Sequence, residues 1–340
     1  MMHEILALLW RSMLTTSIAI CIVLALRLPL RRWLGAQAAY ALWALVPVMA
    51  MVATLPDSTF PATVNSLAPV RVLAAQQVVG SLTPIWRADA ITTIALLACW
   101  LLGAVATTAG FLLQQRRYVN SLGDLHRDAD GWRSASATVG PALVGAWRPR
   151  IVLPADFHTR YTSEERALIV AHERTHLRRG DAQTHALAAL LRSAHWFNPL
   201  VHFAASCLRF DQELACDALV IARFPEARRR YADAMLKTQL VGEARQQPGL
   251  PIGCHWRFDH PMKERIMMLK RPLPTQAHRI AASIGIVALI GCVSLTSWAA
   301  QNAAAPGVVR GKPGIQVGTI ENAGPSEDVT YRRMYPPKYP

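Results

Sequence analysis

Four segments of the chain are apolar over lengths that suit a membrane crossing. Residues 36–55, 91–113 and 280–300 contain no charged residue, and each can cross about 30 Å of hydrocarbon at about 1.5 Å per residue. Residues 5–26 form a fourth apolar segment in which Arg11 is the only charge. Snorkelling toward the interface, or a partner inside the bundle, makes that arginine tolerable. The pattern therefore predicts four transmembrane helices.

A cleavable signal peptide is the alternative interpretation of the first apolar segment. The N-terminus lacks the basic region of a signal peptide. Arg27, Arg31 and Arg32 follow the apolar residues where a cleavage site would need small ones. These two features favour a transmembrane helix.

The charges of the short loops predict the orientation of the chain. The loop after the first apolar segment carries three arginines and no acidic residue, whereas residues 56–90 balance two arginines with two aspartates. The positive-inside rule places the first of these loops in the cytoplasm. Four crossings then place the N-terminus, the loop 56–90 and residues 301–340 in the periplasm, and residues 114–279 in the cytoplasm. An apolar segment that is a buried core helix instead would reverse the orientation of everything after it.

Composition separates a central soluble region from the membrane segments. The chain is 52% hydrophobic and only 17% charged, which is unusual for a soluble protein. Residues 114–279 hold 25 of the 36 basic and 16 of the 22 acidic residues. We therefore predict three transmembrane helices within residues 1–113, a soluble domain over 114–279, a fourth transmembrane helix over 280–300 and a flexible tail over 301–340. The run Arg228 to Arg230 is expected to be a solvated or lipid-facing helix side, so no nucleic-acid partner is predicted.

The cysteines do not have the pattern of a disulfide framework. Three of the six lie in apolar runs and none forms a Cys-x-x-Cys pair, as is typical of buried free thiols in a reducing or lipid environment. Cys207 and Cys216 are expected to be small apolar fillers between helices.

The sequence LIVAHERTHLRRGD contains the strongest candidate chemistry and is expected to be helical. Thr162 and Glu165 form a capping-box pattern ahead of it, and Gly180 is a helix stop. His172 and His176 stand four residues apart, so both rings project from one side of the helix, as two ligands of one zinc ion require.

Glu173 and a second helix complete the predicted site. Glu173 follows the first histidine and is placed to act as a general base on a water at the metal, as in an H-E-x-x-H helix. Asn198 and Pro199 predict the start of another helix, which carries the sequence FDQELACDALV. Glu213 on this helix is the predicted third ligand. Asp217, on the same face, can accept the second ring N–H of a ligand histidine. A solvated helix face is the alternative for both carboxylates, but their apolar neighbours favour partial burial, where a carboxylate needs a cation.

Other polar residues are weaker candidates. Three of them could hydrogen-bond a developing oxyanion: His195, His202 and Tyr231. Another three are close in sequence but match no zinc spacing, so a polar loop is expected there: Cys254, His255 and His260.

With these residues identified, the chain resembles the membrane metallopeptidases of the BlaR/MecR antirepressor type. The resemblance extends to about Trp298 and rests on the four-span layout and on five motifs in order: PALVGAWRPRIVLP, AHERTH, HWFNPLVH, DQELACDALV and KERIMMLK. It implies a mainly α fold with a gluzincin-like cytoplasmic zinc peptidase domain. It also implies that His172, His176 and Glu213 bind Zn²⁺, that Glu173 is the base and that Asp217 supports a ligand.

The motif before the catalytic helix has the character of a β-hairpin. Residues 141–154 contain β-branched positions on both sides of the Arg148-Pro149 turn. The edge of such a hairpin could hold a peptide substrate by main-chain pairing, and a purely structural hairpin is equally compatible with the pattern.

The chain departs from the sensor members of that family at its C-terminal end. Only some 40 residues follow the last apolar segment, and they contain no S-x-x-K motif of a penicillin-binding domain, so sensing of β-lactams is not predicted. The terminal RRMYPPKYP is similar to the opening of a TonB-type domain, which suggests a truncated or split version.

These features predict an inner-membrane zinc endopeptidase. The expected substrate is a cytoplasmic regulatory protein such as a transcriptional repressor, or the chain itself, and by analogy a stimulus outside the cell is passed inward through the helices. Two alternatives stay open: a non-proteolytic signal transducer in which zinc only staples the helices, and an envelope anchor that acts through the tail.

Overall fold

The computed structural model describes residues 2–55, 89–244, 261–272 and 274–304. The described chain is mainly helical with one small sheet, which confirms the predicted fold class. The predicted loop 56–90 and the tail 301–340 lie almost wholly outside the described residues, as do Cys254, His255 and His260.

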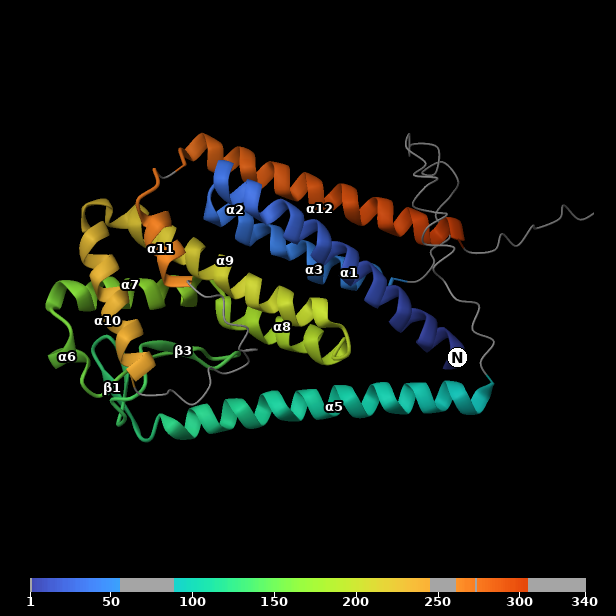
Figure 1. The fold of residues 1–340 in the computed structure, drawn as a ribbon, viewed down its shortest axis with the longest axis horizontal. Coiled ribbons are helices and arrows are strands. Elements are labelled where there is room, and N and C mark those ends of the chain that lie inside the picture. The colour runs from blue at the N-terminus through green and yellow to red at the C-terminus, as the bar shows by residue number, and fades with distance from the viewer. Residues whose placement is uncertain (1, 56–88, 245–260, 273, 305–340) are drawn as a thin grey trace, which may run out of the picture. The chain divides into compact units, whose positions relative to one another are not determined.

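Three described helices are long and apolar enough to cross a membrane. They are α1 (Met2–Trp33), α5 (Ala90–Ser121) and α12 (Gln276–Ala304) (Figure 1). Helix α1 continues through Pro29, so Arg27, Arg31 and Arg32 lie on its last turns and not in a loop. Residues 36–52 form a shorter apolar helical segment: α2 (Ala36–Ala41), the 3₁₀ turn η1 (Leu42–Ala44) and α3 (Leu45–Val52). The second predicted crossing, over residues 36–55, is therefore a shorter apolar helical segment and is not one of the three described helices of spanning length.

The sheet has four strands in the order β1-β2-β4-β3: β1 (Leu125–Asp128), β2 (Gly131–Ser134), β3 (Ala142–Val144) and β4 (Arg150–Leu153). Strands β3 and β4 are the predicted hairpin, paired antiparallel with Leu143 opposite Ile151. Gly145 begins its turn at a φ of 96°, where a Cβ would lie 3.2 Å from the Arg148 carbonyl oxygen. Strand β2 runs parallel to β4. The sequence did not indicate β1 and β2, because their residues are mostly polar and lack an apolar alternation.

The remaining helices surround the candidate chemistry. They are α6 (Phe157–Arg160), α7 (Ser163–Arg179), α8 (Asp181–Ala194), α9 (Pro199–Arg223), the 3₁₀ turn η3 (Pro225–Ala227), α10 (Arg228–Ala244) and α11 (Pro261–Leu269). The predicted ends of α7 are confirmed: Thr162 and Glu165 form a reciprocal capping box, and Gly180 ends the helix at a φ of 74°. Asn198 caps α9 by accepting a hydrogen bond from the Leu200 N–H.

The turn between α8 and α9 lies against the middle of two long apolar helices. His195 Nε2 is 3.2 Å from Ser12 Oγ of α1, and the Asn198 amide donates to Ser17 Oγ at 2.9 Å. Trp196 packs on α5 at Gly103, where a Cβ would come within 2.1 Å of its indole ring. The α8–α9 turn is thus joined to α1 and α5, and α8 also packs on α5 and α9 on α1.

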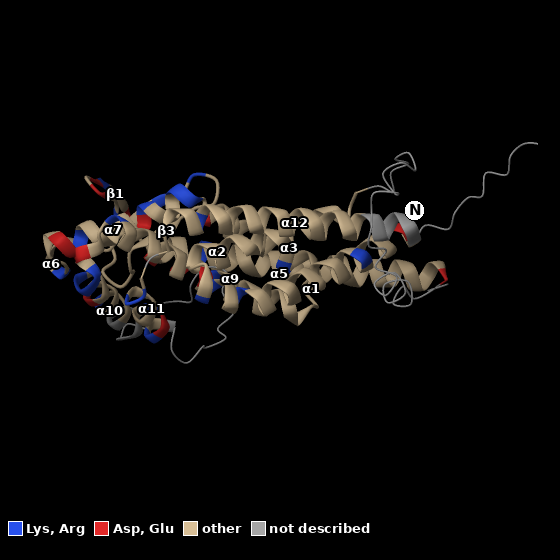
Figure 2. Ribbon diagram, turned by 90° about the horizontal axis from the view of Figure 1, so that it is seen from above, with Lys and Arg blue, Asp and Glu red and all other residues tan. Residues whose placement is uncertain are grey.

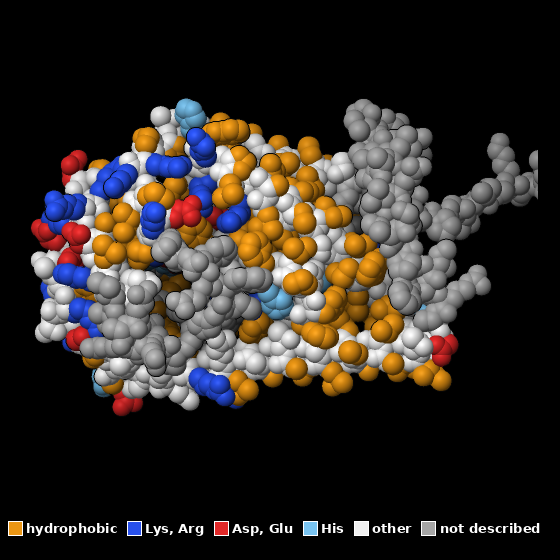
Figure 3. All heavy atoms as spheres, in the orientation of Figure 1, with side chains coloured by type: hydrophobic (Ala, Val, Ile, Leu, Met, Phe, Trp, Pro, Cys, Tyr) orange, Lys and Arg blue, Asp and Glu red, His pale blue; other side chains and the backbone are white. Residues whose placement is uncertain are grey.

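Charge and hydrophobicity are segregated along the described chain. Lys, Arg, Asp and Glu gather near α6, α7, α10, α11 and the sheet, whereas α3 and the middle of α5 and α12 carry none, and α1 carries most of its charges on its last turns (Figure 2). On the face shown in Figure 3, hydrophobic side chains cover much of the region of the long helices. Because lipid tails accept apolar side chains and exclude charges, this distribution is that of a membrane protein with one polar end.

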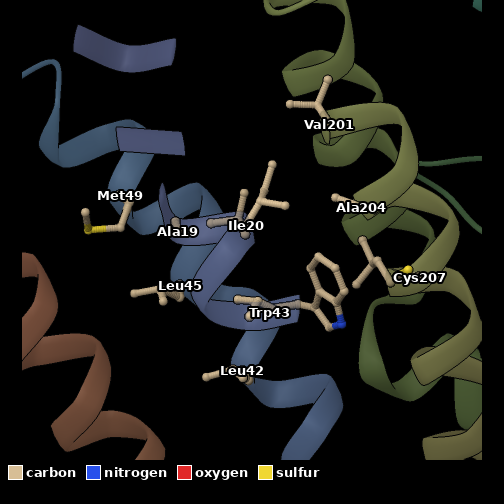
Figure 4. Packing of buried hydrophobic residues seen from close by; sticks show 12 residues of the cluster. Ala19, Ile20, Leu42, Trp43, Leu45, Met49, Val201, Ala204 and Cys207 are labelled. Carbon is tan, nitrogen blue, oxygen red and sulfur yellow. The ribbon is translucent and has the colours of Figure 1, made fainter. Parts of the chain in front are cut away.

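The largest apolar cluster joins the membrane helices to α9. Ile20 of α1 and Trp43 of η1 face Val201 and Ala204 of α9 (Figure 4). At its polar end the Trp43 indole donates to Asp211 at 2.9 Å, and Arg27 of α1 pairs with the same buried carboxylate at 3.2 Å. Asp211 precedes Glu213 by two residues, so these contacts tie the end of α1 to the helix that carries a predicted ligand.

Candidate metal centre

Helix α7 brings two imidazole rings together. His172 and His176 are one helical turn apart, and their Nε2 atoms lie 3.0 Å from each other. His176 is only 7% exposed. Imidazole nitrogens are common ligands for transition metals, so two of them at this distance can share one cation.

Helix α9 supplies a carboxylate to the same point. Glu213 Oε2 is 3.5 Å from His172 Nε2, and Glu213 Oε1 is 3.6 Å from His176 Nε2. Tetrahedral ligands held about 2.0–2.2 Å from a zinc ion stand about 3.3–3.6 Å apart. The two ring nitrogens lie 3.0 Å apart, and each lies 3.5 to 3.6 Å from one oxygen of the carboxylate. These three side chains therefore suit one zinc ion and leave a fourth position for another oxygen.

A thiol offers a second donor set with the same histidines. The side-chain ligand atoms of His172, His176 and Cys216 all lie within 4.8 Å of one another. Cys216 Sγ is 3.3 Å from His172 Nδ1, the ring nitrogen that the Tyr231 hydroxyl also contacts at 2.7 Å. Because that nitrogen has other partners, the Nε2 face and its carboxylate are better suited to an ion. Cys216 is fully buried, which agrees with its expected role as a filler.

His176 is oriented by an aspartate that the sequence analysis did not identify. Asp181 Oδ2 accepts a hydrogen bond from His176 Nδ1 at 2.6 Å, and its Oδ1 accepts one from the Tyr40 hydroxyl at 2.9 Å. Although burial opposes ionisation, these partners and the nearby Arg179 lower the pKa of Asp181. A carboxylate on the outer nitrogen fixes the tautomer that leaves Nε2 free for a metal. The sequence feature that could have identified Asp181 is its position as an acidic residue directly after Gly180, the glycine that ends the helix.

Asp217 supports His172 mainly through another residue. Its Oδ1 is 3.5 Å from His172 Nδ1 but accepts a hydrogen bond from the Tyr231 hydroxyl at 2.7 Å. Tyr231, considered above as an oxyanion donor, thus lies between the aspartate and the imidazole. Arg265 of α11 donates to both oxygens of Asp217 at 2.8 and 2.9 Å. The KERIMMLK motif contained this arginine, but nothing in its spacing indicated a partner.

Arg265 also contacts the predicted third ligand, Glu213, at 3.1 Å. Burial raises the pKa of a carboxylic acid, but the charges of Arg265 and His176 hold the pKa of Glu213 well below its usual range. An ionised carboxylate is the form that binds a metal.

Glu173 is buried beside the two histidines and is 7% exposed. Burial raises its pKa, while the histidine charges act in the opposite direction. A raised pKa suits a carboxylate that must take up a proton during a reaction.

The structure places the two weaker histidine candidates elsewhere. His195 contacts Ser12, and His202 contacts Trp196 and Arg192 at the α8–α9 turn. All five described cysteines are free thiols, as the sequence predicted, but only Cys207 and Cys216 are buried. The other three are exposed on the long apolar helices: Cys21, Cys99 and Cys292.

An edge strand lies beside the histidine helix. Helix α7 packs against β3 and β4, and β3 ends the sheet on that side. The backbone groups on the outer side of an edge strand can pair with an extended peptide.

Comparison with known proteins gives matches to one group. The family model described as BlaR1 peptidase M56 matches residues 7–269. Regulatory protein BlaR1 of Bacillus licheniformis is 30% identical over 98 residues, which are 28% of this chain and 16% of that protein. Methicillin resistance mecR1 protein of Staphylococcus aureus is 24% identical over 149 residues, which are 42% of this chain and 25% of that protein. The matches thus span a quarter or less of each relative's length.

Proposed function

Because the chain belongs to the BlaR1 peptidase M56 family, we propose that it is a zinc endopeptidase of the inner membrane that cleaves a cytoplasmic regulatory protein, or itself, in transmembrane signalling. The observation that carries the proposal is the convergence of His172, His176 and Glu213 within 3.6 Å of one another, beside the buried Glu173. The names of the relatives, a regulatory protein and a resistance protein, support a role in signalling.

In this proposal the two imidazoles and the Glu213 carboxylate hold the zinc ion. When bound there, Zn²⁺ supplies Lewis acidity that polarises a peptide carbonyl and makes a water molecule more acidic. Asp181 and the Tyr231–Asp217 pair orient the two rings from behind. Arg265 stays between Glu213 and Asp217, where it offsets the repulsion between two buried carboxylates.

Glu173 performs the proton transfers. Its carboxylate accepts a proton from the attacking water and then donates that proton to the nitrogen of the leaving amine. The substrate backbone lies extended along the edge of β3, next to α7, where main-chain hydrogen bonds hold the scissile bond near the two histidines.

The charge distribution supports a cytoplasmic site. Arg27, Arg31 and Arg32 lie at the end of α1 that meets the charged part of the molecule, and basic residues beside a membrane helix favour the cytoplasmic side. The substrate is then a cytoplasmic protein.

The test compares full-length wild type with Glu173→Gln in cells. New N-termini of cellular proteins and of the chain itself are identified by mass spectrometry, and bound zinc is measured on the purified proteins. We expect Glu173→Gln to lose the cleavage products and to keep zinc, whereas His176→Ala loses both.

Glu164→Gln is the matched control. Glu164 lies on the same helix with a side chain that is 62% exposed, so this variant should keep both zinc and cleavage. Identical fragments from wild type and Glu173→Gln, with both proteins metallated, would refute proteolysis and leave the non-proteolytic transducer.

A further inference from the structure

The hairpin formed by α8 and α9 has an apolar outer surface. Within residues 184–208 every exposed side chain is apolar: Leu187, Leu190, Phe197 and Pro199. The exposed residues of the neighbouring α7 are mostly polar, and they include Glu164, Arg174 and Arg178. A contiguous surface of apolar side chains marks a contact with another protein or with a membrane, so the hairpin differs in kind from the helix that carries the two histidines.

Contacts with α1 and α5 show how deep the hairpin lies. Residues 91–113 of α5 carry no charge, and Gly103, on which Trp196 of the turn packs, lies at their middle. Ser17, which accepts a hydrogen bond from the Asn198 amide at 2.9 Å, lies near the middle of the apolar part of α1. Both α1 and α5 are long and apolar enough to cross a membrane. Two such helices therefore place the turn at the same level, which is the middle of the bilayer.

The lengths of α8 and α9 match the distance from the middle of a bilayer to its surface. Half of a hydrocarbon core of about 30 Å is about 15 Å, and α8 and α9 lie along α5 and α1 (Figure 1). Arg209, the first charged residue of α9, comes ten residues after Pro199, which corresponds to about 15 Å. The 14 residues of α8 extend about 21 Å, so Asp181 lies past the edge of the hydrocarbon. Between these limits Arg192 is the only charged residue of the hairpin.

Protein groups surround Arg192. This residue is only 3% exposed. Its guanidinium lies 4.5 Å from the centre of the Phe111 ring of α5, and its Nε donates to His202 Nδ1 at 3.3 Å. Charged residues inside a membrane face the protein interior and have partners there, so the enclosure of Arg192 agrees with a hairpin in hydrocarbon.

The non-helical turn has protein partners for its backbone carbonyls. The Trp100 indole of α5 donates to the Ala194 carbonyl at 2.8 Å, and His202 Nε2 donates to the Trp196 carbonyl at 2.9 Å. Irregular backbone is stable at membrane depth only where the protein satisfies its polar groups. In water the solvent can satisfy them, so this pairing by side chains favours an environment without water.

We propose that α8 and α9 form a re-entrant hairpin inside the bilayer, with the turn at the midplane and lipid acyl chains covering Leu187, Leu190 and Phe197. Residues 182–208, assigned to a soluble domain by the sequence analysis, then belong to the membrane part of the protein. Because α8 begins directly after α7 and Glu213 lies beyond the hydrocarbon edge on α9, the metal centre lies at the membrane surface. The proposal does not depend on the proposed peptidase activity.

The test measures depth by fluorescence quenching in the full-length protein, reconstituted in phosphatidylcholine nanodiscs. A fluorescent amino acid replaces Phe197 or Leu187, and the phosphatidylcholine carries bromine either near the end of its acyl chains or near the headgroup. We expect the deep bromine to quench the label at Phe197 more strongly than the shallow bromine does. The label at Leu187, about 10 Å from the turn toward the charged end, should show the opposite order. Iodide in the aqueous phase should quench neither label.

Two further positions calibrate the measurement. Leu102 lies at the middle of the uncharged part of α5 and is 71% exposed, so a label there should respond as the label at Phe197 does. The side chain of Glu164 on α7 is 62% exposed, and its label should be quenched by iodide and by neither lipid.

Two outcomes of the quenching measurement would overturn the proposal. Quenching of the labels at Phe197 and Leu187 by iodide, and not by either lipid, would place the hairpin in water. Quenching by neither iodide nor lipid would mean that protein, such as a second copy of the chain, covers this surface.

A substitution without a label gives an independent check. Leu190→Asp puts a charge at a position that is 64% exposed and about 6 Å from the turn along α8. Charged side chains are costly in hydrocarbon but change little at an exposed site in water, so the urea midpoint of the protein in nanodiscs should fall. Gln183→Asp is the control, because Gln183 is exposed and lies about 17 Å from the turn on the same helix. Equal urea midpoints for the two variants would contradict a hairpin in the bilayer.

Discussion

Replacing Asp181 by asparagine tests whether the two histidines hold a metal through their Nε2 atoms. Asp181 is 2% exposed, and its carboxylate accepts hydrogen bonds from His176 Nδ1 at 2.6 Å and from Tyr40 at 2.9 Å. Asparagine keeps the shape and one acceptor oxygen, which can still face His176. It removes the negative charge that makes the imidazole a stronger donor to a cation.

The expected size of the effect follows from this single change. Loss of a partner on the outer nitrogen of a ligand histidine lowers metal affinity about 10- to 100-fold, which corresponds to about 1.4–2.7 kcal/mol. The fold itself should be preserved, because asparagine has nearly the size of aspartate and leaves the apolar clusters around α7 and α9 intact. Tyr40→Phe, one contact further from the metal, should give a smaller loss.

The assay is competition for Zn²⁺ between the full-length protein in detergent and a chromophoric chelator. The visible spectrum of the Co²⁺-loaded protein reports separately whether the coordination geometry is retained. Asp130→Asn is the control, because that aspartate is 38% exposed and lies 4.0 Å from Arg174. If Asp181→Asn binds Zn²⁺ as tightly as wild type, His176 is not a ligand held in this orientation and the assigned donor set is incorrect.

Three further changes give separate checks. Arg265→Gln removes the cation paired with the buried Asp217 and should lower the free energy of unfolding by about 3–5 kcal/mol. Urea unfolding in detergent measures this loss, and an unchanged urea midpoint would contradict the buried ion pair. Thr162→Ala removes the cap of α7 and should cost about 1 kcal/mol by the same measurement, with zinc affinity little altered. The hydrogen bond from His158, together with Arg133, lowers the pKa of Asp128 to about 2 from 3.8. The stability that this lowered pKa contributes is therefore present above about pH 4 and lost as the pH falls toward 2. Asp128→Asn should accordingly be less stable than wild type at pH 7 and equal to it near pH 2. A difference in stability that stays constant between pH 7 and pH 2 would contradict the assigned contacts of Asp128.

Local sequence patterns were sufficient for the elements that carry the chemistry. The capping box, the i, i+4 spacing of His172 and His176 and the stop at Gly180 are all properties of one helix, and the structure confirms that helix. The long apolar segments likewise follow from the thickness of a bilayer, although α1 extended past its predicted end because an apolar run does not mark where helical hydrogen bonding stops.

Other features depended on segments that are far apart in the chain. Strand β2 pairs with β4 although its own residues have little strand character, since a neighbouring strand satisfies its backbone groups. The placement of Tyr231 between His172 and Asp217, and of Arg265 against Glu213, requires α7, α9, α10 and α11 to pack together.

Asp181 shows most clearly how local sequence and tertiary packing each contribute to the site. Its position after Gly180 is a local fact, but its function arises because α2, more than a hundred residues earlier, places Tyr40 on one carboxylate oxygen while α7 places His176 on the other. Helix periodicity specifies which side chains share a face, whereas contacts between helices depend on how several apolar surfaces are buried at once. The spacing of the two candidate histidine ligands within one helix could therefore be predicted from the residues, whereas the approach of Glu213 on α9 to these histidines on α7 depended on tertiary packing.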